Sequence, residues 1–165
     1  MSRKILLGIF MLFVTVQMQA QTKMKIGYAN TDSILTNMQE FKTQQKVLES
    51  YSKQLQNQLK ARYTKAEATM ATIRERLQAG EITQAKAQQE AYVLQIQMQK
   101  DEADAQEKLG AKEQELLEPL YEKIKKGIET VAKANGYTHV FPDRMFISMT
   151  DSADITQLVI DKLKG

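Results

Sequence analysis

The 165-residue chain contains no cysteine and only one histidine, His139. Without cysteine it can form no disulfide framework, no thiol nucleophile and no lipid-modified N-terminal cysteine. The histidine has no second ligand or catalytic partner near it in the sequence, and no Gly-rich phosphate loop or metal-binding spacing is present. We therefore expect no enzymatic activity, no catalytic or metal-binding site and no cofactor.

Excess positive charge is also scarce once the first residues are set aside. Arg3 and Lys4 belong to the 23 basic residues, and removing these two leaves 21 basic against 20 acidic residues. A nearly neutral chain offers no polycationic surface of the kind that binds nucleic acid. We therefore expect no nucleic-acid partner.

The N-terminus has the parts of a secretory signal peptide. Arg3 and Lys4 precede an apolar run over residues 5–16, about twelve residues long and too short to span a bilayer comfortably. Ala20 then supplies a small residue at the expected cleavage site. The pattern predicts that residues 1–20 are a signal peptide cleaved near Ala20, and that the protein is exported from the cytoplasm. An uncleaved membrane anchor is the alternative.

Proline and glycine are absent from residues 41–77, where apolar side chains recur at steps of three and four. The same spacing resumes over residues 82–135, and Gly80 between the two stretches suits the left-handed end of a helix. The sequence therefore predicts a long antiparallel helical hairpin, or arm, over residues 41–118 with its tip near Gly80. Lys60 and Arg62 should face Lys100, Asp101 and Glu102, so that opposite charges meet across this hairpin. Pro119 should act as a hinge at the root of the arm.

Shorter segments flank the hairpin. Three segments alternate or are rich in β-forming residues: 23–30, 137–141 and 145–149. The last residues have the apolar face of a closing helix. The sequence therefore predicts a small β/α body with three strands, formed by residues 21–40 and 119–165. Because so small a sheet exposes its edges and buries little, we expect it to associate with copies of itself. The expected oligomerisation residues are Ile26, Tyr28, Val140, Phe141, Phe146 and Ile147.

These features together resemble the Skp/OmpH family of periplasmic chaperones. The resemblance depends on the signal peptide, the long hairpin rich in Gln, Lys, Glu and Ala, and the segments KIGYANTDSILTNMQEF, LLEPLYEKIKKGIETVAKANGYTHVF and DITQLVIDKLK. It covers essentially all of the mature chain. The chain departs from the family after Phe141, where the turn at residues 142–144 is shorter than usual.

The resemblance implies an α+β, mainly α fold and a jellyfish-like homotrimer. Strands at residues 25–29, 138–141 and 146–149 would build the body, and three arms over residues 44–111 would enclose a cavity. It also implies an ATP-independent holdase in the periplasm. Unfolded outer-membrane β-barrel proteins would be its partners.

A holdase needs adaptable apolar contacts on the arm, which Met and Tyr side chains provide well. The residues expected to contact clients are Tyr63, Met70, Ile73, Tyr92, Ile96 and Met98. The alternative is that each of them only packs between the two arm helices. A basic tip formed by Arg74, Arg76 and Lys86 could make transient contact with anionic membrane lipids, or could simply be solvated.

A different class of function remains open on the sequence alone. A coiled-coil spacer or adaptor of the cell envelope, with one fixed partner, would also have a long helical hairpin. Such a protein would usually show an unbroken heptad repeat with regular charges beside it. The Met and Tyr residues on the arm favour the chaperone.

Overall fold

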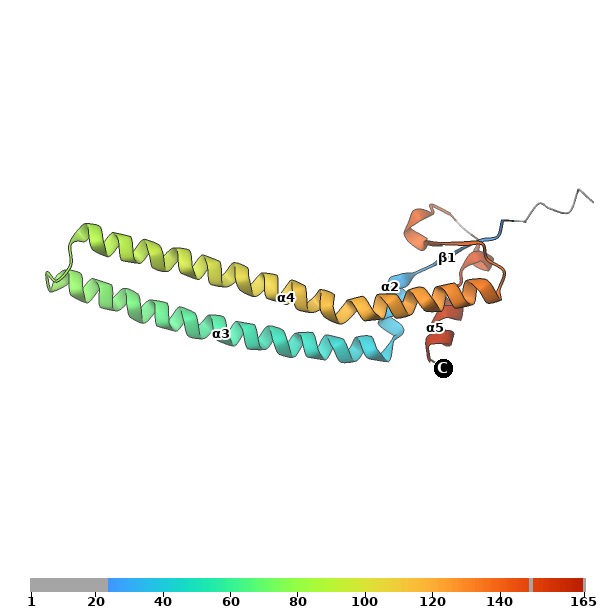
Figure 1. Ribbon diagram of the computed structural model, residues 1–165, viewed down its shortest axis with the longest axis horizontal. Helices are drawn as coiled ribbons and strands as arrows, with labels where there is room; N and C mark the ends of the chain where they lie inside the picture. The colour runs from blue at the N-terminus through green and yellow to red at the C-terminus, as the bar shows by residue number, and fades with distance from the viewer. Residues whose placement is uncertain (1–23, 149, 165) are drawn as a thin grey trace, which may run out of the picture.

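Two long helices form a hairpin that projects from a small body (Figure 1). The computed structural model describes residues 24–148 and 150–164, so the predicted signal peptide lies outside the described residues. The fold is α+β and mainly α, as the sequence predicted. In chain order the elements are β1 (Ile26–Ala29), α2 (Thr31–Asn37), α3 (Gln39–Gln78), α4 (Gln84–Ala134), β2 (His139–Pro142), the 3-10 helices η2 (Asp143–Met145) and η3 (Asp151–Ala153), and α5 (Thr156–Lys164). None of the helices in residues 24–148 and 150–164 is long and apolar enough to cross a membrane.

The tip of the arm is a tight turn between α3 and α4. Gly80 adopts a left-handed conformation with φ 72°, which glycine reaches without steric cost. The backbone N–H of Glu81 donates to the carbonyl of Arg76 at 2.9 Å and so satisfies a carbonyl in the last turn of α3. Thr83 then caps α4, because its hydroxyl accepts from the N–H of Lys86.

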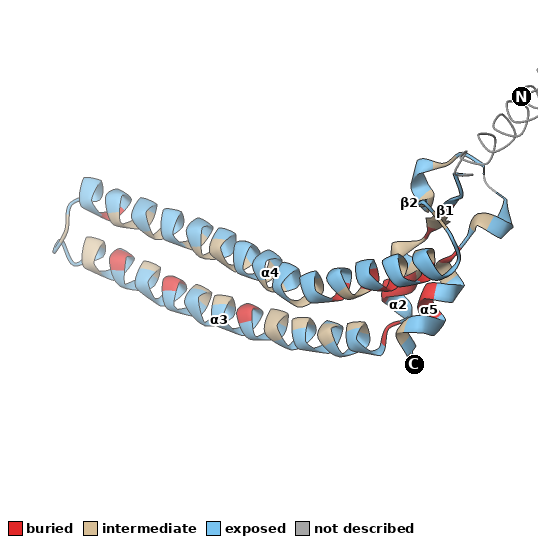
Figure 2. Ribbon diagram, turned by 45° about the vertical axis from the view of Figure 1, so that its right-hand side comes forward, coloured by how far each residue is buried: buried red, intermediate tan, exposed pale blue. Residues whose placement is uncertain are grey.

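A narrow apolar seam holds the two arm helices together. Its buried residues are Leu55, Ala66 and Ile73 from α3 and Ala87 from α4. Figure 2 shows buried positions at intervals along α3, while most of both helices is exposed. Pro119 lies inside α4 without ending it, and α4 changes direction where the arm meets the body (Figures 1 and 2). A proline removes one helical hydrogen bond and is a common cause of such a bend.

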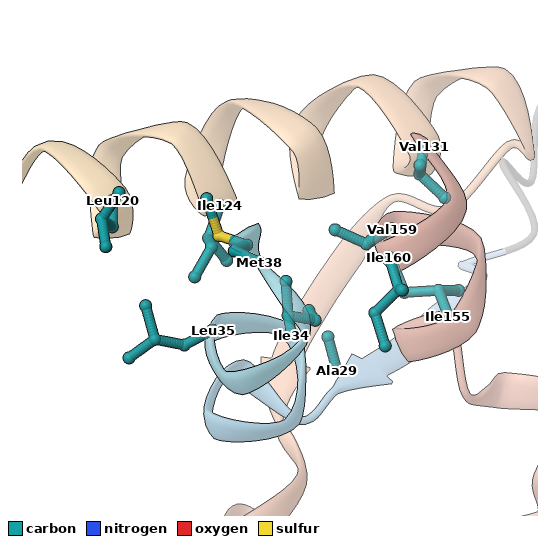
Figure 3. Close-up of a cluster of buried hydrophobic side chains, with 10 residues drawn as sticks. All are labelled: Ala29, Ile34, Leu35, Met38, Leu120, Ile124, Val131, Ile155, Val159 and Ile160. Atoms are coloured by element: carbon teal, nitrogen blue, oxygen red, sulfur yellow. The ribbon is translucent and has the colours of Figure 1, made fainter. Parts of the chain in front are cut away.

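The core of the body lies between α2, α5 and the C-terminal part of α4 (Figure 3). Four of its side chains are fully buried: Ile34, Ile124, Ile155 and Val159. Gly127 allows α4 and α5 to approach closely, because a Cβ atom at this position would lie 3.0 Å from Cδ2 of Leu163. The cluster therefore joins the first helix of the body to the last one.

The sheet has two parallel strands, which pair the two ends of the chain. Ile26 lies opposite His139, and Tyr28 lies opposite Phe141. Tyr28 also forms an isolated bridge with Asp154, where the N–H of Ile155 donates to the carbonyl of Tyr28 at 2.9 Å. Segments more than a hundred residues apart thus meet at β1.

The prediction of a third strand at residues 145–149 is wrong for the residues described. After Pro142 the chain turns into η2, and the N–H of Phe146 donates to the carbonyl of Asp143 at 3.1 Å. Asn30 holds Asp143 by a side-chain hydrogen bond, which fixes this turn against α2. Phe146 therefore packs its ring against Phe141, with centroids 5.7 Å apart, and has no strand partner. Met149 lies outside the described residues.

Candidate functional site

One side of the arm is closed by ion pairs between α3 and α4. Arg62 pairs with Asp101, as the sequence predicted, and Arg76 pairs with Glu90 at 3.1 Å. The hydrogen bond from Arg62 lowers the pKa of the Asp101 carboxyl, and Gln97 donates a second hydrogen bond to it. The same contact raises the pKa of the Arg62 guanidinium. We call this the ion-paired side of the arm.

The opposite side of the seam is open and forms a groove. Around α4, at about 100° per residue, Glu90 and Asp101 lie on one flank of Leu94, while Ala91 and Gln95 lie on the other. There the surface is hollowed into an open groove of about 580 Å³. Its lining residues are Met70, Gln88, Ala91, Tyr92, Leu94, Gln95, Met98, Gln99 and Glu102. We call it the arm groove.

The arm groove brings together three of the six residues predicted to contact clients. Met70 reaches it from α3, and Tyr92 and Met98 reach it from α4. Met70 and Met98 are half-buried, whereas Tyr92 is 64% exposed. Flexible thioethers and a largely exposed aromatic ring thus line one surface.

A patch of apolar side chains continues from Tyr92 around α4, away from α3. Val93 is 60% exposed and Ile96 is 46% exposed. The three residues lie at steps that place them on adjoining parts of one helix face. We call them the outer patch. Sequence reasoning included Tyr92 and Ile96 but missed Val93, which directly follows Tyr92.

The two remaining predicted contact residues lie closer to the seam. Ile73 is only 6% exposed and packs between α3 and α4, so it offers a client almost no free surface. Tyr63 is half-buried beside Leu59 and Met98 and has less free surface than Tyr92. Most of each of these two side chains is therefore buried between the arm helices, which is the alternative that the sequence left open.

The basic tip is partly neutralised by carboxylates. Arg76 lies 3.9 Å from a carboxylate oxygen of Glu81 in addition to its pair with Glu90, and Lys86 lies 4.0 Å from Glu90. Arg74 is exposed and makes no ion pair within the described part of the chain. Of the three predicted residues, only Arg74 therefore presents an uncompensated cation.

Bulky apolar side chains gather on the surface of the body. Ile147 is fully exposed, Ile26 is partly exposed, and Tyr28, Val140 and Phe141 are half-buried. Burial raises the pKa of the Tyr28 hydroxyl, with smaller contributions from Asp154, Asp151 and Asp143.

A second hollow, of about 490 Å³, lies between α4 and β2 and is lined mainly by apolar groups. Ile124, Ile128 and Tyr121 line it from α4, and Val140 and Phe141 line it from β2. Tyr121 is 45% exposed there. We call it the body groove. Val140 and Phe141 belong to β2, so the body groove and this strand together present an apolar face around β2.

A projecting helical hairpin with exposed apolar side chains, carried on a small α/β body, defines an elongated protein with separate arm and body surfaces. The chain belongs to the OmpH-like outer membrane protein family, whose model matches residues 25–163. Its fold is similar to the crystal structure of an OmpH-like protein from Caulobacter crescentus CB15, described as an outer membrane chaperone. The TM-score is 0.62 at 17% identity, over 85% of this chain and 83% of that one. No curated protein matches the sequence.

Proposed function

We propose that this protein is an ATP-independent holdase chaperone of the periplasm. It binds unfolded outer-membrane β-barrel proteins after their export and keeps them from aggregating. Membership of the OmpH-like family supports this proposal, as does the likeness of the fold to a protein described as an outer membrane chaperone. The export signal at residues 1–20, with cleavage near Ala20, would deliver the protein to that compartment.

The observation that carries the proposal is the outer patch beside the arm groove. Tyr92, Val93 and Ile96 are 64%, 60% and 46% exposed on an arm whose remaining surface is mostly polar. A helix that served only to pack against α3 would have no use for large apolar side chains on its outward face. Met and Tyr side chains adapt to many partners without burying any of them deeply, which allows release without an energy source.

Self-association as a homotrimer is part of the proposal. The body groove, the exposed Ile147 and the apolar face around β2 offer a surface for a second and a third copy. Three arms would then surround a cavity large enough for a client. The body would occupy residues 21–40 and 119–165, and the arm residues 41–118. Arg74 at the tip could add transient contact with anionic lipids.

The test is light scattering of the mature protein, alone and with an outer-membrane β-barrel protein diluted from urea. We expect the mass of a trimer and a soluble complex on mixing. The double substitution Tyr92→Ser with Ile96→Ser should lower the affinity for the client about tenfold, because it removes most of the outer patch. The substitution Gln89→Ser, at an exposed polar position on the same helix, should have no effect.

The alternative, a coiled-coil spacer or adaptor with one fixed partner, predicts a different result. A spacer would keep its oligomeric mass but leave the unfolded client to aggregate. A stable monomer would contradict both the trimer and the cavity.

A further inference from the structure

One stripe of α4 runs the length of the arm groove. Its residues follow one another at steps of four, three, four and three: Gln88, Tyr92, Gln95, Gln99 and Glu102. This spacing places all five on one face of the helix. Met70, Leu94 and Met98 form the apolar side of the groove next to the seam. The arm groove is therefore apolar on the side next to the seam and bordered on the other side by a row of mostly polar side chains.

The apolar side of the channel suits an aromatic ring. Thioether sulfurs make favourable contacts with the edges of aromatic rings, and Met70 and Met98 approach the channel from different helices. Tyr92 offers a third contact, because aromatic side chains also pair with one another. An inserted ring would thus meet three groups that favour aromatic over aliphatic side chains.

The margin of the channel suits an extended backbone. Each glutamine side chain carries both a donor and an acceptor, so Gln88, Gln95 and Gln99 can bond to the N–H and C=O groups of a peptide laid beside them. The distance from Gln88 to Glu102 along α4 is about 21 Å at the helical rise per residue. This length fits about six residues of an extended chain.

Glu102 gives one end of the channel a negative charge. It is the one acidic side chain among the residues that line the groove, none of which is basic, and it makes no ion pair within the described part of the chain. Its neighbours three and four residues away on α4 are Met98, Gln99, Ala105 and Gln106, none of which is basic. A cation at that end of the groove would therefore meet the Glu102 carboxylate, which has no basic neighbour three or four residues away on α4.

We infer that the arm groove is a peptide subsite for an extended segment of unfolded chain in which an aromatic residue is followed or preceded by a basic one. The aromatic ring lies between Met70, Met98 and Tyr92, and the basic side chain reaches Glu102. This inference rests on the proposed function and deepens it. It assigns each arm its own sequence preference, separate from enclosure of the client in a cavity.

The test uses two short fluorescein-labelled peptides, one alternating Tyr with Lys and one alternating Tyr with Glu. Fluorescence anisotropy at low salt measures their binding to the full mature protein. We expect the Tyr–Lys peptide to bind about fivefold more tightly. Glu102→Gln should remove most of this preference, whereas Glu107→Gln, an exposed carboxylate on the same helix outside the groove, should leave it unchanged.

A second pair of variants separates the groove from general apolar adhesion. Tyr92→Ser should weaken binding of the Tyr–Lys peptide about fivefold, because one wall of the channel is lost. Val47→Ser, at an exposed apolar position of α3 outside both the groove and the outer patch, should change it less than about twofold. Circular dichroism of each variant verifies that the helices are intact.

Equal effects of Glu102→Gln and Glu107→Gln, or of Tyr92→Ser and Val47→Ser, would overturn the inference. Failure of both peptides to bind, as expected if a second copy of the chain covers the groove, would also overturn it. Suppression of client aggregation is measured on the same samples. A protein that suppresses aggregation but does not distinguish the peptides retains the proposed function and loses the subsite. A protein that suppresses no aggregation loses the proposed function.

Discussion

The body and the arm are held together in different ways. The body buries ten apolar residues in one cluster built from α2, α4, α5 and the end of β1. The arm contains much more helix than the body, yet its seam buries only four apolar residues, two of which are alanines. Burial of large side chains is what stabilises most helices in proteins. The comparison indicates that the body supplies most of the stability of the fold. The arm buries little and instead exposes apolar side chains that can contact other proteins.

The largest expected effect comes from emptying the body core. Ile124 of α4 is 1% exposed and belongs to the core cluster, so Ile124→Ala should cost about 2–5 kcal/mol of unfolding free energy. Urea denaturation followed by circular dichroism measures this loss. Ile96→Ala on the outer patch is the matched control and should change stability by less than about 0.5 kcal/mol. Equal losses would contradict the division between body and arm.

A smaller and more local effect is expected in the seam of the arm. Ile73→Ala should cost about 2 kcal/mol, the lower end for such a change, because the thin seam can close around the missing atoms. Hydrogen exchange should speed up near the tip of the arm and remain unchanged in α5. Faster exchange across both regions would show that arm and body unfold as one unit.

The smallest effect concerns Asp101 and acid pH. Its pKa is lowered in the folded protein, so its contribution is fully present above the unfolded pKa, near 4, and is lost as the pH falls through the folded value. Asp101→Asn should therefore lower the melting temperature at neutral pH and leave it unchanged in strong acid, where Asp101 is protonated. The effect at neutral pH should be slight, because the partner Arg62 is largely exposed. Thermal melts at both pH values, with Glu107→Gln as control, measure the difference.

Most of the fold followed from periodicity and from residues with special backbone behaviour. The long apolar repeat predicted both arm helices, and Gly80 predicted the turn. The charge pattern predicted that Lys60 and Arg62 lie opposite residues 100–102, where Arg62 pairs with Asp101. The prediction of a third strand was wrong because β-forming residues near Phe146 do not show whether a neighbouring strand is available to pair with them. The hydrogen bond from Asn30 to Asp143, between residues far apart in sequence, fixes that turn.

The candidate site could be predicted only in part. The sequence identified Met70, Tyr92 and Met98 by residue type, but it could not separate them from Ile73, which has the same helical spacing. Whether such a residue faces the seam or solvent depends on the rotation of α4 against α3, and that rotation follows from the packing of the whole arm. Val93 was missed for the same reason.

The sheet pairs segments from opposite ends of the chain, and this has a consequence for the order of folding. Lys25 and Thr138 meet although they are 113 positions apart in the sequence, whereas the arm is made from contacts that grow outward from the turn at Gly80. Local contacts form early because little loop entropy is lost in closing them. During synthesis or export the N-terminus emerges first. The arm can then fold before β2 and α5 are available to pack against β1 and α2. The arm then brings the two halves of the body together, so the surface proposed for self-association is the last part of the molecule to form.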